Sequence, residues 1–163
     1  MLLSELWERL CQVKALTFVA RSGNPAGWNG RGSGTVVVRS AGDDAITYTE
    51  SGSWRPERGR GLRFRNVFRW SKAEDGLRLE HLRFGEGHPV YLFDLAPAED
   101  GQWRSVSPHV CSEDCYAATL LVLDDRVVLR WSIDGPRKQE QVEYTYAWWA
   151  NDEEAVVFEP GGG

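Results

Sequence analysis

The chain has 163 residues, and its 24 acidic and 19 basic residues give a formal charge of −5 at pH 7. This length predicts one domain, with a core large enough to fold without metal or disulfide staples. The negative charge argues against nucleic acid or an anionic membrane as the partner. Three cysteines are an odd number, which argues against a secreted disulfide framework and predicts free thiols.

The first predicted element is a short amphipathic helix over residues 3–12, with Ser4 as a candidate N-cap. Charged residues interrupt its apolar face, so the segment is expected to be neither a signal peptide nor a membrane span. We therefore expect a cytoplasmic protein. The helical spacing is carried by four apolar residues: Leu3, Leu6, Trp7 and Leu10.

From residue 30 to residue 147, apolar and polar residues alternate, and tight-turn signals such as Asp75-Gly76 and Asp100-Gly101 interrupt the alternation. Such a succession predicts an all-β fold, an antiparallel meander barrel of about ten strands with the helix across one end. Residues 1–150 form this domain, and residues 151–163 form an acidic tail that ends in glycines. The predicted strands cover residues 13–21, 31–40, 44–54, 61–72, 76–84, 88–96, 102–110, 115–123, 126–133 and 138–148.

The alternation also predicts which face of each strand is buried. Eight Trp, five Tyr and six Phe give an interior rich in rings, which suits either a flat amphipathic ligand or a barrel filled by its own side chains. Arginines of the same strands, namely Arg63, Arg65, Arg69 and Arg78, are predicted to lie outside. The predicted core includes Leu62, Phe64, Phe68, Trp70, Leu129, Trp131, Ile133 and Val142.

Six arginines crowd residues 55–69, and acidic residues gather in the last third of the chain, for example Glu140 and Glu143. One interpretation is that the two sets face each other across neighbouring strands. The other is a guanidinium platform that holds a phosphate or a carboxylate.

The segment from His109 to Tyr116 is dense in reactive side chains. One hypothesis is a metal site formed by His109, Cys111 and Cys115. Another is a nucleophile pair of Cys111 and His109 that Asp114 orients. A third is a plain hairpin in which Asp114 accepts hydrogen bonds from backbone amides. Because the spacing matches no standard zinc pattern, we predict neither a metal nor another cofactor.

The turn over residues 134–138 reads Asp-Gly-Pro-Arg-Lys. Gly and Pro suit a hairpin, but a turn does not require the Arg-Lys pair that follows them. We expect Arg137 to reach a carboxylate at the barrel mouth, either Asp114 or a group on a ligand.

Together these residues carry a resemblance to a known family. His109-x-Cys111-x-x-Asp114-x-Tyr116, followed by Gly135-Pro136-Arg137-Lys138, resembles the signature of an uncharacterised family of lipocalin-like (calycin-type) domains found in bacteria and fungi. Tyr48-x-Glu50-x-Gly52 and residues 88–95 are also similar to that family, whereas Gln139-Glu140 departs from it. The resemblance covers most of residues 13–147, and it implies a bacterial barrel of unknown function with no assigned activity.

Three functions follow as hypotheses. The first is a small-molecule-binding barrel for an amphipathic or acidic ligand, and its predicted site residues are His109, Asp114, Tyr116, Arg137, Tyr144 and Tyr146. The second is an isomerase, cyclase or hydrolase in which His109 acts as general base. The third is a self-filled barrel that binds a protein through the surface of residues 55–69. A haem site on His81, His88 or His109 is a fourth and more distant alternative.

Overall fold

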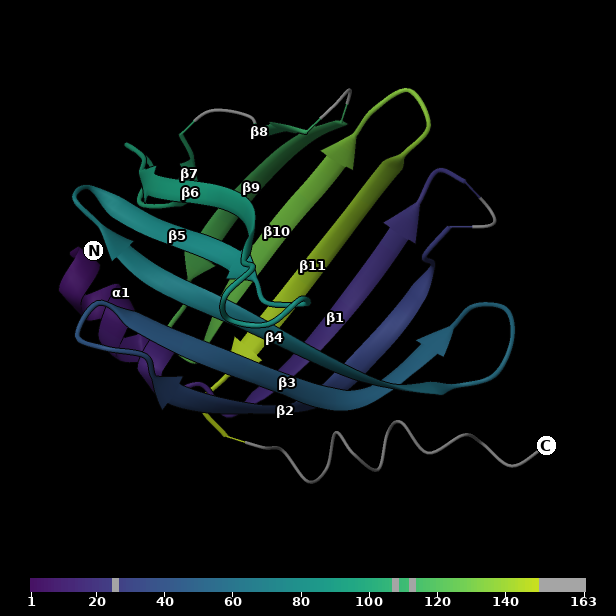
Figure 1. The fold of residues 1–163 in the computed structure, drawn as a ribbon, viewed down its shortest axis with the longest axis horizontal. Coiled ribbons are helices and arrows are strands. Elements are labelled where there is room, and N and C mark those ends of the chain that lie inside the picture. Colours follow the sequence, from purple (N-terminus) through teal and green to yellow (C-terminus); the bar gives the residue numbers. More distant parts are fainter. Residues whose placement is uncertain (25–26, 107–108, 112–113, 150–163) are drawn as a thin grey trace.

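A computed structural model describes residues 1–24, 27–106, 109–111 and 114–149, with only the backbone for 109–111. One helix and eleven strands follow in chain order (Figure 1). The helix is α1 (Leu3–Cys11), and the strands are β1 (Ala15–Ser22), β2 (Gly30–Ser40), β3 (Ala45–Pro56), β4 (Leu62–Ala73), β5 (Gly76–His81), β6 (Val90–Pro97), β7 (Trp103–Ser105), β8 (His109–Cys111), β9 (Asp114–Val122), β10 (Arg126–Asp134) and β11 (Gln139–Ala147).

Ten of these strands form a closed antiparallel barrel. The order runs β10-β11-β1-β2-β3-β4-β5-β6-β7-β9, and pairing of β9 with β10 closes the circle. The predicted all-β barrel with one N-terminal helix is therefore confirmed. The predicted strand over residues 102–110 is instead two short strands, because β7 pairs with β6 and β9 whereas β8 pairs with β9 alone.

Helix α1 closes one end of the barrel, at the left in Figure 1. It buries Leu6, Trp7 and Leu10, and full burial of such a side chain contributes roughly 1.5–3 kcal/mol. Trp148 donates a 2.9 Å hydrogen bond from its indole nitrogen to the Arg9 carbonyl, which ties the helix to the end of β11. The helix begins at Leu3 with Leu2 at the N-cap position, so the predicted capping by Ser4 is wrong.

The opposite end carries the connections between β1 and β2, between β3 and β4, and between β10 and β11, at the right in Figure 1. The sheet bends sharply between β2 and β3, where Gly34 lies opposite Gly52. A Cβ atom on Gly52 would lie 2.0 Å from the Ser33 carbonyl oxygen, so no larger residue fits this bend. Glycine at such positions is typical of barrel corners.

The predicted core is buried in part, and the departures from the prediction lie on the half of the barrel away from α1. Phe68, Trp70 and Leu129 are buried. Leu62, at the rim of the open end, is 62% exposed, because β4 begins there and β5 pairs with β4 only from Phe68 onward. The other predicted core residues are only half-buried, namely Phe64, Trp131, Ile133 and Val142.

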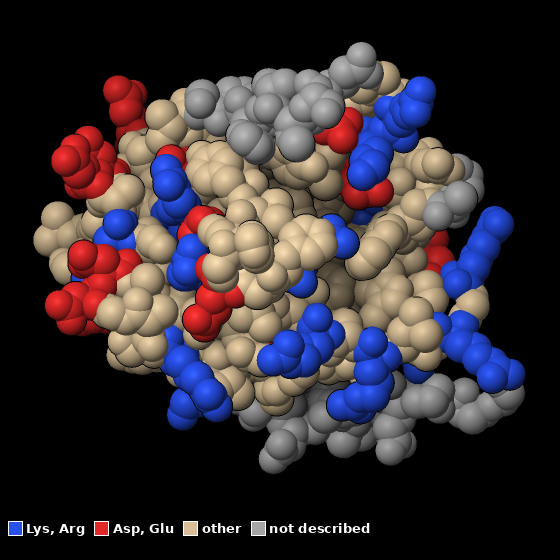
Figure 2. All heavy atoms as spheres, in the orientation of Figure 1, with Lys and Arg blue, Asp and Glu red and all other residues tan. Residues whose placement is uncertain are grey.

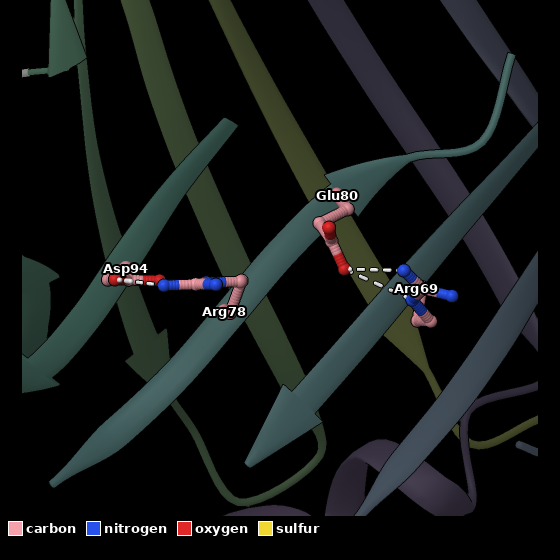
Figure 3. A network of polar contacts seen from close by, with 4 residues as sticks. All are labelled: Arg69, Arg78, Glu80 and Asp94. Carbon is pink, nitrogen blue, oxygen red and sulfur yellow. Dashed lines mark hydrogen bonds and ion pairs between the residues drawn. The ribbon is translucent and has the colours of Figure 1, made fainter. Parts of the chain in front are cut away.

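Outside the barrel, ion pairs cross β4, β5 and β6 (Figure 3). Arg69 on β4 contacts Glu80 on β5 at 3.0 Å, and Arg78 on β5 contacts Asp94 on β6 at 2.9 Å. The acidic partner of Arg69 is thus Glu80 and not a residue from the last third of the chain. Glu143 pairs instead with Arg130 of the neighbouring strand at 2.6 Å.

Candidate functional site

The inner face of the barrel has a sealed half and an open half. Near α1, inward side chains such as Tyr146, Leu129 and Tyr48 are at most 3% exposed. Towards the other end, inward side chains are partly exposed on five strands, and the surface in Figure 2 is hollowed near the centre of the face shown. Solvent therefore reaches part of the inner face. These half-buried residues are Trp54, Phe64, Asn66, Tyr116, Trp131, Ile133, Glu140 and Val142.

Glu50 lies at the boundary between the two halves. Its side chain is fully buried on β3, and in the strand register it is opposite Val36 on β2 and Asn66 on β4. Asn66 is half-buried, so solvent contacts the residue directly beside a sealed carboxyl group. Glu50 thus lies at the inner end of the open half.

Burial raises the pKa of the Glu50 carboxyl to about 8, because the charged form loses its hydration. The Tyr146 hydroxyl donates a 2.7 Å hydrogen bond to Glu50 Oε2, which opposes the rise but does not cancel it. Near neutral pH the group is therefore mainly the uncharged acid. In that form it also has a hydrogen to donate.

Two polar atoms in this region have no partner among the described residues. They are Glu50 Oε1 and the indole nitrogen of Trp70, and both are buried. A buried polar atom without a hydrogen bond costs about 1–3 kcal/mol. A bound polar group of a ligand, or a water molecule, would remove this cost at Glu50.

Tyrosine rings surround Glu50 on the sealed side. Tyr144 and Tyr146 stack on β11 with ring centroids 5.7 Å apart, and Tyr48 meets Tyr146 edge-on at 5.5 Å. The Tyr48 hydroxyl donates to the Leu10 carbonyl of α1. Burial, and then the nearby Glu50, raise the pKa of all three phenols, so the cluster stays uncharged.

The open half has small residues on one wall and rings on the other. Inward positions of β2 beyond Val36 are Gly34, Gly32 and Gly30. The Phe18 ring lies over Gly32, where a Cβ atom would come within 2.2 Å of it. Phe18 also stacks on Trp54 at 5.4 Å and meets Phe64 at 5.3 Å. The result is an aromatic wall that reaches the rim of the barrel.

The strand pairing brings most of the predicted site residues to this open end. His109 pairs with Tyr116, and Tyr116 pairs with Ile133. Asp114 lies against the turn between β10 and β11, where a Cβ atom on Gly135 would be 2.0 Å from Asp114 Oδ1. The side chains of His109 and Cys111 lie outside the described residues.

The six predicted site residues form two groups. Asp114 and Tyr116 are half-buried at the rim, and Arg137 is exposed on the turn between β10 and β11. Tyr144 and Tyr146 lie deeper, against Glu50. Among the described contacts, Arg137 makes no ion pair with Asp114, so its guanidinium is available to a ligand. The binding roles of these residues stay predictions.

Sequence reasoning missed Glu50 as a site residue. The signal was present, because Glu50 interrupts the apolar positions of its strand, between Tyr48 and Gly52. A carboxyl at an inward position is rare unless it is paired or functional.

Within the described residues, no group of three His, Cys, Asp or Glu side chains is arranged to hold a metal ion. In that same part of the chain, no helix has the length and apolar character of a membrane span. Cys11 and Cys115 are free thiols.

Comparison with known proteins places the chain in a family. No curated protein matches it. One solved structure, described as the de novo design of a fluorescence-activating beta barrel, is similar with a TM-score of 0.40 and 15% identity, over 83% of this chain and 92% of that one. The family model described as "Family of unknown function (DUF6314)" matches residues 19–148. The chain therefore belongs to this family, DUF6314, which has no assigned function.

Proposed function

We propose that the protein binds a small amphipathic molecule in the open half of its barrel. The observation that carries the proposal is Glu50, a fully buried carboxyl with one unpartnered oxygen beside inward residues that solvent reaches. Ligand sites are typically apolar clefts with a few convergent polar groups. The resemblance to lipocalin-like domains supports the same function, and the free thiols fit a cytoplasmic location.

The apolar body of the ligand would lie against the rings of Trp54, Phe64 and Trp131. Aromatic walls of this kind suit a flat molecule, because stacked and edge-on contacts both add to the gain from burial. Its polar end would exchange hydrogen bonds with Glu50 and Asn66. A neutral Glu50 donates and accepts, so a carbonyl or hydroxyl group satisfies it without a charge.

The rim residues would then select the charge of the ligand. Glu140 and Asp114 are half-buried acids at the mouth, whereas Arg137 is the exposed base on the adjacent turn. An acidic ligand would bind only if its attraction to Arg137 exceeds its repulsion from these two carboxylates. The enzymatic alternative rests on His109, whose side chain lies outside the described residues.

A blocking substitution tests the site. Val142→Trp places a large ring at an inward, half-buried position on β11, and Gln141→Trp places the same ring on the exposed outer face of the same strand. The probe is N-phenyl-1-naphthylamine, an uncharged aromatic fluorophore, titrated against each full-length variant. We expect Val142→Trp to weaken binding about tenfold, a loss of about 1.4 kcal/mol, and Gln141→Trp to leave it unchanged.

A parallel titration with the anionic probe 1-anilinonaphthalene-8-sulfonate distinguishes neutral from acidic ligands. Native mass spectrometry of protein purified from its own host then identifies a retained molecule. Equal binding of the neutral probe by the wild type and by Val142→Trp, with both proteins folded, would exclude the barrel interior as the site.

A further inference from the structure

A second candidate site lies on the outer face of the barrel, over β2, β3 and β4. The alternation that turns Glu50 and Trp54 inward turns the residues between them outward. On these three strands the outward positions carry hydroxyl residues and arginines but no Asp or Glu. Figure 2 shows Lys and Arg side chains at the lower right, over the β3–β4 hairpin. The six outward arginines are Arg31, Arg39, Arg55, Arg63, Arg65 and Arg69.

Three of these arginines surround a hollow of about 250 Å³. Arg31 on β2 is directly opposite Arg55 on β3, and Arg63 on β4 is opposite Ser53. The other residues that line it are Gly32, Ser33, Ser53, Trp54, Gly61 and Leu62. Three arginines and two serines therefore line one small space.

These three arginines lack the carboxylate partners that several other arginines of the sheet have. Arg69 and Arg78 each have a carboxylate partner on the next strand (Figure 3). No described residue forms an ion pair or hydrogen bond with the guanidinium of Arg31, Arg55 or Arg63. Like charges directly opposite each other on neighbouring strands are destabilising, so the fold alone gives no reason for this arrangement.

We propose that Arg31, Arg55 and Arg63, with Ser33 and Ser53, bind the phosphoryl group of a small phosphorylated molecule. A carboxylate is satisfied by one forked guanidinium, whereas three cations from three strands require an anion with more charge and more acceptor oxygens. A phosphoryl group supplies three oxygens and up to two negative charges. The hollow is smaller than the roughly 300–1,000 Å³ of typical drug-sized pockets, which fits a head group with its remainder in solvent.

This inference goes beyond the proposed function, because its arginines and serines are at outward positions, although Trp54 lines the hollow as well as the interior site. Its test is calorimetric titration of the full-length protein with inorganic phosphate and with pyrophosphate at low ionic strength. We expect saturable binding that weakens as salt is added, since surface charges are screened. Phosphate should also raise the melting temperature of the wild type.

Two variants make the test specific. Arg55→Gln removes the central guanidinium and should weaken pyrophosphate binding roughly tenfold or more. Without ligand its melting temperature should equal or exceed that of the wild type, because the repulsion from Arg31 is lost. Arg39→Gln is the matched control, since it removes an outward arginine of β2 that has no partner among the described residues and lies outside the hollow, and it should leave binding unchanged.

Three results would overturn the proposal. The first is an absence of saturable binding by the wild type, and the second is an equal loss in Arg55→Gln and Arg39→Gln, which would indicate diffuse charge only. The third is binding that appears only in the variant Asp152→Asn/Glu153→Gln/Glu154→Gln. That result would mean that the chain's own acidic segment is the ligand of the arginines in the wild type. Saturable binding of a single-stranded oligonucleotide or of phosphatidylserine vesicles in preference to pyrophosphate would also overturn the proposal. It would show that the arginines bind a larger partner and not a small phosphorylated molecule.

Discussion

The Tyr146 hydroxyl donates a 2.7 Å hydrogen bond to the carboxyl of Glu50, across the interior of the barrel from β11 to β3. This is the only described side-chain hydrogen bond that Glu50 makes, and it leaves the second carboxyl oxygen unpartnered. We therefore expect this buried acid to make the stability of the fold depend on pH.

Stability should fall as the pH rises through the titration range of Glu50. Its pKa is about 8 in the folded protein and 4.5 in the unfolded chain, so between these values the folded state binds more protons. The free energy of unfolding therefore declines from about pH 4.5 to beyond pH 8, at up to roughly 1.4 kcal/mol per pH unit. Thermal melts of wild type and Glu50→Gln from pH 5 to 9 measure this. The variant should lack the decline, and a parallel decline in both proteins would assign it to other groups.

Tyr146→Phe should destabilise the protein and move the same transition to higher pH. The lost bond leaves the Glu50 carboxyl with no side-chain donor, which costs about 1–3 kcal/mol. Because the bond lowers the pKa of Glu50, its removal raises that pKa further. Tyr144→Phe is the control, since Tyr144 stacks beside Tyr146 but makes no described hydrogen bond to Glu50. A shift of the pH midpoint in the control as large as that in Tyr146→Phe would contradict this assignment.

Arg137→Met should leave the melting temperature unchanged. The side chain is exposed and has no described partner, and surface substitutions of this kind usually stay within about 0.5 kcal/mol. If Arg137 receives an acidic ligand at the barrel mouth, the variant should bind the anionic naphthalene probe more weakly and the uncharged probe equally well. Equal affinities for both probes in both proteins would identify Arg137 as a solvated turn residue.

The barrel could be predicted from the sequence because its signals are local. Alternation and turn residues are read directly from the chain, and the pairing of β3 with β4 follows from the hairpin between them. A barrel also requires a pairing that is distant in sequence, between β1 and β11, and only the number of strands indicated it. The exposure of Leu62 was not predictable, because alternation gives the face of a strand but not how far its neighbours extend.

The candidate site was predicted only in part for the same reason. Tyr144 and Tyr146 were identified as inward residues of β11, but their partner Glu50 lies almost a hundred residues earlier. No local pattern shows that these two strands, separated by β1 and β2 in the sheet, meet across the interior. The Arg31–Arg55 pair likewise follows from strand register, which single-sequence patterns define poorly.

The two ion pairs of Figure 3 should differ in strength. The side chains of Arg69 and Glu80 are 24% and 13% exposed, whereas those of Arg78 and Asp94 are 47% and 31% exposed. Solvent screens the second pair more, and exposed pairs contribute only about 0.2–1 kcal/mol. Removal of Glu80 also leaves the half-buried Arg69 without its only described partner, and a stranded charge adds to the cost.

Glu80→Gln should therefore lower the melting temperature more than Asp94→Asn. The two isosteric amides keep the shape of each side chain, so packing is matched between the variants. High salt should reduce the effect of Asp94→Asn more than that of Glu80→Gln, since screening acts mainly on exposed charges. A double-mutant cycle with Arg69→Met and Arg78→Met isolates each pairwise energy. Equal coupling energies in the two cycles would show that burial does not decide the strength of these outer-face pairs.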